Sequence, residues 1–265
     1  MNKLKIGYRI NVDNFLTSKD EYDKFIDYYY SLFECAELKI TSKVYESDFF
    51  KYIIFKFLRY DNYSNNFHIN KRYLNDLNDY SKLFSVTDKS VNYITHLYDY
   101  YVNDDLINRI KKISCLIPNG CNLLLENPEI SIDIFEYIDR CNEFCIRLDE
   151  LDINNIGLCL DFGHLLCILD SQKVDFDLFY DYLVKYKELL NRVREFHLHD
   201  YYDGLDHRLI TVDSLNLLKF KKLYDVCSSG NVIILENDVS NDPLNIGIKQ
   251  VNIIKEVLLN EDKRD

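Results

Sequence analysis

Glycine and proline are scarce in this 265-residue chain, with 7 and 3 residues, and tryptophan is absent. The few glycines accompany an abundance of Asn, Ile, Lys and Tyr, a pattern that reflects genomic base composition more than function. No low-complexity linker or composition boundary divides the chain. We therefore expect residues 1–265 to form a single domain, because this length suits one large domain and the 47% hydrophobic content supplies a core.

Long apolar runs and Cys-x-x-Cys pairs are also missing. No uninterrupted apolar stretch approaches the roughly 18–20 residues that span a bilayer, and no signal peptide precedes the first strand-like segment. The 8 cysteines lie mostly inside apolar runs, which is typical of buried, reduced thiols. These absences predict a cytoplasmic protein without a membrane partner.

Basic residues are outnumbered, with 32 Lys and Arg against 44 Asp and Glu, so the net charge is −12. An acidic surface repels phosphate backbones, and affinity for nucleic acids depends mainly on neutralising phosphates. A nucleic-acid partner is therefore disfavoured. It is not excluded, because a local basic or metal-lined groove can still bind one.

Eight short apolar runs recur roughly every 30 residues, with amphipathic segments between them. Nearly all-apolar runs are typical of parallel strands covered on both faces. Eight alternating strand–helix units of this length predict a (β/α)8 TIM barrel, of class α/β. The expected strands are Lys5–Ile10, Ala36–Ile40, Asn66–Ile69, Val91–His96, Asn122–Glu126, Gly157–Asp161, Glu195–Asp200 and Val232–Glu236.

Capping signals mark most of the expected helices. Ser18-Lys19-Asp20-Glu21 is a capping box before the helix at 22–33. Other expected helices are 104–116 capped by Asn103, 132–151 capped by Ser131, 177–193, 215–227 capped by Asp213 or Ser214, and 244–259 opened by Pro243. The second and third units are the weakest, since 43–60 fits either one helix or a helix with a loop.

Ligand-type side chains follow the expected strands at their carboxyl ends, where barrel enzymes place their active sites. Each such residue alone is more often structural, but five consecutive units, strands four to eight, deliver one. Buried carboxylates at a barrel mouth must be paired or metal-bound. The joint pattern predicts a divalent-metal site at this end of the barrel. Its candidate ligands are Glu126, Asp161, His197 and Glu236, and the possible additional contacts to metal or substrate are His68, His96, His164, His199 and His207.

The motifs Glu126-Asn127-Pro128, Asp161-x-x-His164 and His197-x-x-Asp200, with Glu236 after strand eight, resemble the xylose isomerase-like TIM-barrel superfamily. That superfamily contains sugar-phosphate isomerases and epimerases, related dehydratases, and endonuclease IV. The resemblance covers the whole chain in order, and the first two strands are its least diagnostic part.

In the epimerase-like branch, the resemblance implies one divalent ion held by Glu126, Asp161, His197 and Glu236. The ion expected first is Mn²⁺, with Mg²⁺, Co²⁺, Zn²⁺ or Fe²⁺ as alternatives. The two glutamates would move a proton next to a carbonyl of a sugar or polyol while the ion stabilises the enediolate. Substrate contacts would come from His164, Arg208 and Arg9, although a salt bridge at the rim explains Arg9 equally well.

The endonuclease IV branch builds a three-metal cluster on the same frame, with extra histidines. His68, His96, His164 and His207 are candidates for these. Three features depart from the nuclease: Asp206 and His207 are adjacent where its pattern separates them by one residue, strand one lacks its histidine, and Asn127-Pro128 is more usual among isomerases. His199 lies on the same side of its strand as His197 and can contact metal, substrate or another ligand.

The leading hypothesis from the sequence is a metal-dependent sugar isomerase or epimerase, or a related lyase that begins with the same proton abstraction. The alternatives are phosphodiester hydrolysis at abasic DNA, a histidine-rich multinuclear enzyme acting on a small molecule or peptide, and a barrel that has lost catalysis. The expected partner is a carbohydrate-like small molecule, and nothing in the sequence specifies an oligomeric state.

Overall fold

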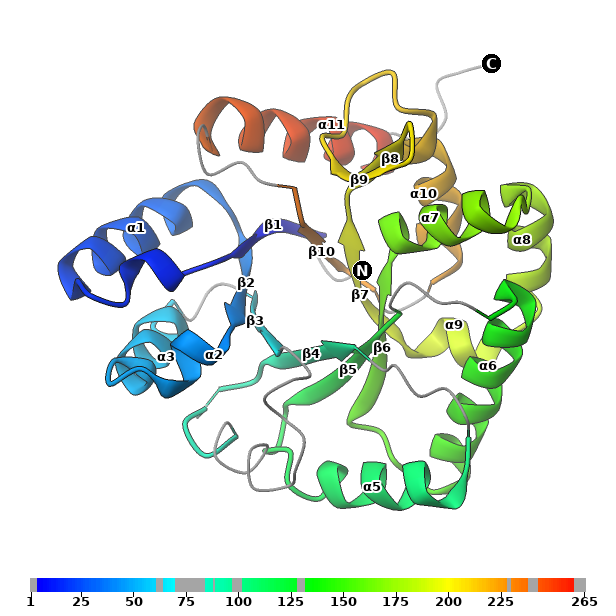
Figure 1. The fold of residues 1–265 in the computed structure, drawn as a ribbon, viewed down its shortest axis with the longest axis horizontal. Coiled ribbons are helices and arrows are strands. Elements are labelled where there is room, and N and C mark those ends of the chain that lie inside the picture. Colours follow the sequence, from blue (N-terminus) through cyan, green and yellow to red (C-terminus); the bar gives the residue numbers. More distant parts are fainter. Residues whose placement is uncertain are drawn as a thin grey trace.

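The strands close into a parallel barrel with helices around its outside, as the computed structural model shows (Figure 1). The structure describes residues 4–60, 64–69, 84–87, 89–96, 102–127, 132–227, 230–237 and 243–259. The strand order around the barrel is β1-β10-β7-β6-β5-β4-β3-β2. The strands are β1 Lys5–Ile10, β2 Cys35–Ile40, β3 Ser64–Ile69, β4 Asn92–His96, β5 Asn122–Glu126, β6 Ile156–Asp161, β7 Val193–Leu198 and β10 Val232–Leu235. The predicted (β/α)8 barrel is thereby confirmed.

All eight predicted strands are present, and two end earlier than expected. β7 ends at Leu198 and β10 at Leu235, so His199 and Glu236 lie just past the ladder. The Glu236 N–H still donates to the Leu198 carbonyl at 3.3 Å, which keeps these two strand ends together. Most strand residues are buried, in agreement with strands covered on both faces.

Side chains cap several of the helices, whereas Ser214, at the N-cap of α10, makes no side-chain capping bond. The Ser18 hydroxyl accepts the Glu21 N–H, and the Asn103 side chain accepts the Leu106 N–H, as predicted. Ser131 lies outside the described residues, and Asp133 caps α6. The helices are α1 Lys19–Leu32, α2 Ser42–Glu46, α3 Phe50–Leu58, α5 Asp104–Ser114, α6 Ile134–Glu150, α7 Phe162–Gln172, α8 Phe176–Leu183, α9 Lys187–Arg192, α10 Leu215–Val226 and α11 Ile248–Leu259.

Three helix predictions need correction. The expected helix 177–193 is two helices, α8 and α9, separated by a turn in which the Tyr186 N–H donates to the Leu183 carbonyl. The Tyr186 hydroxyl contacts Asp139 of α6, a tertiary contact that local periodicity does not encode. Residues 43–60 contain two short helices, and the segment after Pro243 opens with a π-helical turn before α11.

A small hairpin after β7 was not predicted. It consists of β8 Asp200–Tyr202 and β9 Leu205–Arg208, paired antiparallel. Its two-residue turn is Asp203-Gly204, and both residues have positive φ, at 56° and 72°. Asp-Gly is the dipeptide that such tight hairpins prefer, so the signal was present in the sequence. In Figure 1 the hairpin lies beyond the end of β7.

The described part of the chain contains no helix long and apolar enough to cross a membrane. The core is apolar outside the strands, between barrel and helices, whereas polar side chains enter the barrel itself. Glu37, Asn66, Glu195 and His197 are all at most 2% exposed. A polar interior in a barrel calls for an explanation, since buried polar groups are costly unless they are paired.

Candidate metal centre

The predicted central group assembles at the carboxyl ends of neighbouring strands. Glu126 ends β5, Asp161 ends β6, His197 lies in β7, and Glu236 directly follows β10. One potential ligand atom from each lies within 4.8 Å of the others. Glu126, Asp161 and His197 are at most 1% exposed. We refer to these four residues as the central group.

His197 lies between carboxylates on both sides of its ring. Its Nε2 is 2.8 Å from Glu37 Oε2, and its Nδ1 is 3.0 Å from Glu126 Oε1 and 2.6 Å from Glu236 Oε1. Burial opposes a charge on this ring, but Cys159, Glu37, Glu126 and Glu236 together raise its pKa well above the usual value. Both ring nitrogens therefore donate to carboxylates.

Arg9 also enters the central group. Its Nε donates to Glu37 Oε1 at 2.6 Å and its Nη1 to Glu236 Oε2 at 2.8 Å. Nη2 contacts Glu236 Oε1, lies 3.1 Å from His197 Nδ1 and is 4.0 Å from Glu126 Oε1. Burial opposes the charge of Arg9, yet Glu236, Glu37 and Glu126 raise its pKa. Its predicted substrate contact stays a prediction.

A second group forms on the β3–β4 side. His68 is the second-to-last residue of β3, and its Nε2 is 2.9 Å from Glu126 Oε2. His96, the last residue of β4, places Nε2 3.3 Å from the same oxygen. Burial lowers the pKa of His96 to about 4, so its imidazole is neutral at neutral pH and can bind a metal without losing a proton. Glu126 is thus shared with the central group.

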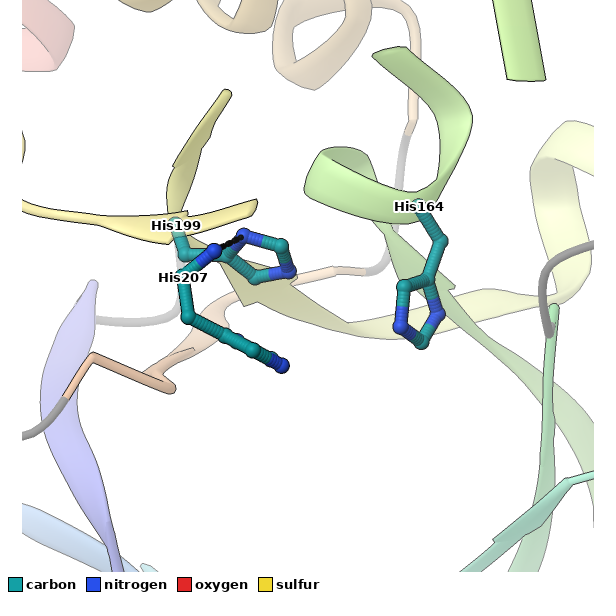
Figure 2. A group of neighbouring side chains, drawn as sticks. All are labelled: His164, His199 and His207. Carbon is teal, nitrogen blue, oxygen red and sulfur yellow. Dashed lines mark hydrogen bonds between the residues drawn. The ribbon is translucent and has the colours of Figure 1, made fainter. Parts of the chain in front are cut away.

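A third group contains His164, His199 and His207, each offering a ring nitrogen within 4.8 Å of the others. Figure 2 shows His164 reaching in from the first turn of α7 toward the other two rings. The Nδ1 of His164 is 3.1 Å from the Asn127 carbonyl. A ring that donates Nδ1–H to a carbonyl leaves Nε2 free to bind a metal, which is the usual arrangement of metal-binding histidines.

His199 differs from its two neighbours in this group. Its Nδ1 accepts the backbone N–H of His207 at 2.9 Å, the dashed line in Figure 2. In the neutral ring the proton therefore occupies Nε2, which faces Asp161 Oδ1 at 3.3 Å. His199 is thus placed to orient Asp161 and the His207 backbone more than to bind a metal itself. His207 has φ 51°, a left-handed conformation that this hydrogen bond helps to hold.

The three groups are contiguous. The ring centroids of His68 and His96 are 5.1 Å apart, those of His96 and His164 6.2 Å, and those of His199 and His207 4.2 Å. His68 also lies 5.9 Å from His197. All six histidines of the chain therefore line one continuous site around the central carboxylates, although the sequence scatters them over 140 residues (68 to 207).

The buried polar atoms fit divalent cations. Asp161 Oδ2 and His68 Nδ1 find no hydrogen-bond partner among the described residues. Burial opposes the charge of Glu126, but His197 and His68 hold its pKa well below the usual range, and Asp161 is kept ionised in the same way by His164 and His199. Anionic oxygens and imidazoles converging in a buried site are the donors that such ions require.

Two predicted residues lie at the edge of this site. Arg208 is in the hairpin with its guanidinium 5.2 Å from the Tyr202 ring, and its carbonyl accepts from Asn237. Asp200 accepts from Ser214 and Asn216, so it anchors the hairpin to α10. The structure does not bring Arg208 into any of the three groups.

Sequence reasoning missed Glu37 and Glu195. Glu37 bonds to both His197 and Arg9 from within β2. Glu195 lies deeper in the barrel, accepts from Asn66 and Asn92, and burial together with Glu37 raises its pKa to about 8. Both are in mid-strand, whereas the expected site residues lie at strand ends. A charged residue inside an otherwise apolar strand was the available signal.

No family model matches this chain, and no curated protein matches it in sequence. Solved structures match it in fold. The structure of AsfvAP:AG has a TM-score of 0.67 at 14% identity, covering 97% of this chain and 100% of its own. A D-psicose 3-epimerase in the presence of D-fructose has a TM-score of 0.59 at 12% identity, covering 97% and 100%.

The IolI protein with a bound zinc atom has a TM-score of 0.57 at 12% identity, covering 98% of this chain and 100% of its own. These matches confirm the predicted barrel fold. Identities this low show the fold alone, so the function must be argued from the site.

Proposed function

We propose that this chain is a multinuclear metal-dependent hydrolase that cleaves phosphodiesters, with DNA at abasic sites as its substrate. The observation that carries the proposal is the shared carboxylate of Glu126, which belongs both to the central group and to the group of His68 and His96. An enzyme with one metal in the central group does not need two further histidines, His68 and His96, beside Glu126 Oε2. If two neighbouring ions bind, Glu126 would help to hold both of them.

The residues divide into three adjoining metal positions. His68, His96 and Glu126 form the first, the central group the second, and His164 with His207 the core of the third. Bound divalent ions would polarise phosphodiester oxygens and generate a nucleophile from water at neutral pH. The imidazole-rich outer positions favour Zn²⁺, and the carboxylate-rich central position also suits Mn²⁺ or Mg²⁺.

The surrounding residues fix these donors in place. Glu37 holds the Nε2–H of His197, so that Nδ1 faces the central position. The Asn127 carbonyl accepts the Nδ1–H of His164, which leaves Nε2 for a metal. The Asn127 side chain also ties β5 to β6 through the backbone N–H and C=O of Asp161. Rigid support of this kind determines metal affinity nearly as much as the ligands themselves.

The net charge of −12 does not oppose this proposal once the metals are counted. Three divalent ions bring more positive charge than Glu126, Asp161 and Glu236 neutralise. The barrel mouth would then be locally positive inside an acidic protein, which attracts a phosphate to the site while the remaining surface disfavours non-specific binding. Affinity for DNA should depend on the bound metal.

A single-metal sugar epimerase is the second candidate. Glu126 and Glu236 both lie within 3.0 Å of His197 Nδ1, as two proton-transferring carboxylates around one ion would. This function uses the central group and leaves His68, His96 and His207 without a role. We rank it second for that reason.

Metal counting and two activity assays separate the candidates. The protein is loaded with Zn²⁺, dialysed, and analysed for metal per chain, then given a labelled duplex with one abasic site and, separately, D-fructose. More than one ion per chain with strand cleavage supports the hydrolase. One ion with conversion of D-fructose to its C3 epimer supports the epimerase.

His68→Ala provides the matched variant. It should remove one ion and lower cleavage at least a hundredfold if His68 is a ligand. The same substitution should leave an epimerase with its single ion. Retention of every ion and of full cleavage in His68→Ala would contradict the shared-carboxylate arrangement.

A further inference from the structure

The guanidinium of Arg9 lies where the ligand atoms of the central group converge. It bonds both oxygens of Glu236 and lies 3.1 Å from His197 Nδ1 and 4.0 Å from Glu126 Oε1. Three of the four central ligands therefore face this one cation. Arg9 reaches the position from β1, and its side chain is 16% exposed.

A guanidinium and a divalent ion cannot share these atoms. Each Glu236 oxygen that accepts from Arg9 would have to turn to the metal, and two cations at this distance repel each other strongly in a buried site. Arginine stays protonated in proteins, so the conflict cannot be relieved by loss of a proton. The side chain has to move.

Arg9 has a second partner to move toward. Its Nε donates to Glu37 Oε1, which lies outside the central group. A guanidinium that leaves Glu236 can therefore stay paired with Glu37, and the cost of its release is reduced accordingly. Arg9 also comes within 4.0 Å of Glu126 Oε1, which belongs to the group of His68 and His96, but its hydrogen bonds go to Glu236 and Glu37.

We infer that Arg9 is an internal competitor for the central metal position, so that the two outer positions load first and the central one loads last and most weakly. This inference rests on the proposed multinuclear site. It adds that the central ion is exchangeable and that metal concentration controls assembly of the full site. In the metal-free chain, Arg9 serves as counter-ion to the carboxylates that would otherwise repel one another.

The test is a Zn²⁺ titration of the purified chain against a chromophoric chelator, which yields the number of ions bound and each affinity. Wild type should show tight outer positions and one weaker position. Arg9→Met keeps the length of the side chain and removes its charge, and should tighten the weak position at least tenfold. Arg147→Met, on the exposed face of α6, is the control and should match wild type.

Stability provides a second readout. In the presence of a chelator, Arg9→Met should have a lower melting temperature than wild type because the carboxylates lose their counter-ion. Adding Zn²⁺ should raise the melting temperature of Arg9→Met more than that of wild type. If Arg9→Met does not fold without metal, Arg9→Lys replaces it. A single ammonium cannot bond Glu37 and Glu236 together as the guanidinium does, so the weak position should still tighten at least threefold.

The outcomes separate the two claims. Unchanged or weaker binding in both Arg9 variants, with several ions in wild type, overturns the competition and leaves the proposed function standing. No Zn²⁺ in wild type or in the variants overturns both. Central binding that appears only when Arg9 is replaced upholds the competition and removes the proposed function of the wild-type chain.

Discussion

The Nε2 atom of His197 lies 2.8 Å from Glu37 Oε2, and both side chains are fully buried. Burial opposes the charge of Glu37, but His197 and Arg9 lower its pKa to about 2. The carboxylate is therefore ionised at neutral pH, and it fixes a proton of His197 on Nε2. If His197 holds a metal, this carboxylate would make the ligand nitrogen more basic.

Glu37→Gln should weaken metal binding without unfolding the barrel. The amide can still accept from Nε2–H but carries no charge, so we expect affinity for Zn²⁺ at the central position to fall about tenfold. Zinc titration measures the loss, and ¹⁵N chemical shifts of the His197 ring report its tautomer. Glu34→Gln, a partly exposed neighbour paired with Lys255, is the control. Equal affinity in both variants would contradict the role given to Glu37.

Gly163→Ala should disturb the third group through His199. A Cβ at position 163 would lie 1.9 Å from His199 Cε1 and 2.3 Å from its Nδ1, so the imidazole would have to move. That movement breaks the bond from the His207 backbone and shifts the ring away from Asp161. We expect one Zn²⁺ position to weaken about tenfold.

A double-mutant cycle checks this cause. In a His199→Ala background, the ring that clashes is gone, so Gly163→Ala should have little further effect on Zn²⁺ affinity. Additive losses would mean that residue 163 acts by another route, such as its position in the first turn of α7.

The barrel and most of its mouth could be predicted from the sequence because strand ends and helix caps are local signals. Glu126, Asp161 and His197 lie where the strand pattern places them. Glu37 could not be found in this way, because its role depends on β2 facing β7 across the barrel. The bond between His199 and the His207 backbone depends on a hairpin, whose local signal in the sequence is the Asp203-Gly204 turn.

Gly204→Ala should loosen that hairpin. Gly204 has φ +72°, and a Cβ there would meet nothing within 4 Å, so the cost is backbone strain alone, about 1 kcal/mol. His207 lies three residues further along, so affinity for Zn²⁺ at the third group should fall by up to about fivefold. Gly204→Asn should lose less, because asparagine tolerates this conformation. An equal loss of Zn²⁺ affinity in Gly204→Ala and Gly204→Asn would mean that the added side chain, and not backbone strain, causes the loss.

Cys227 should resist alkylation in the folded protein. Burial raises the pKa of its thiol from 9.0 to about 12, whereas Cys115, which follows α5, is exposed. The thiolate is the reactive form. At pH 8, iodoacetamide should therefore modify Cys115 first, as peptide mass spectrometry can show, and Cys115→Ser should remove the fastest phase.

The raised pKa of Cys227 also fixes the direction of its pH dependence. The folded state keeps a proton that the unfolded state loses near pH 9, so this thiol's contribution to stability is complete below pH 9 and declines as the pH rises toward 12. Over the same range, labelling of Cys227 in the folded protein should increase about tenfold per pH unit. Rapid labelling of Cys227 at pH 8, without unfolding, would show that α10 opens at its carboxyl end.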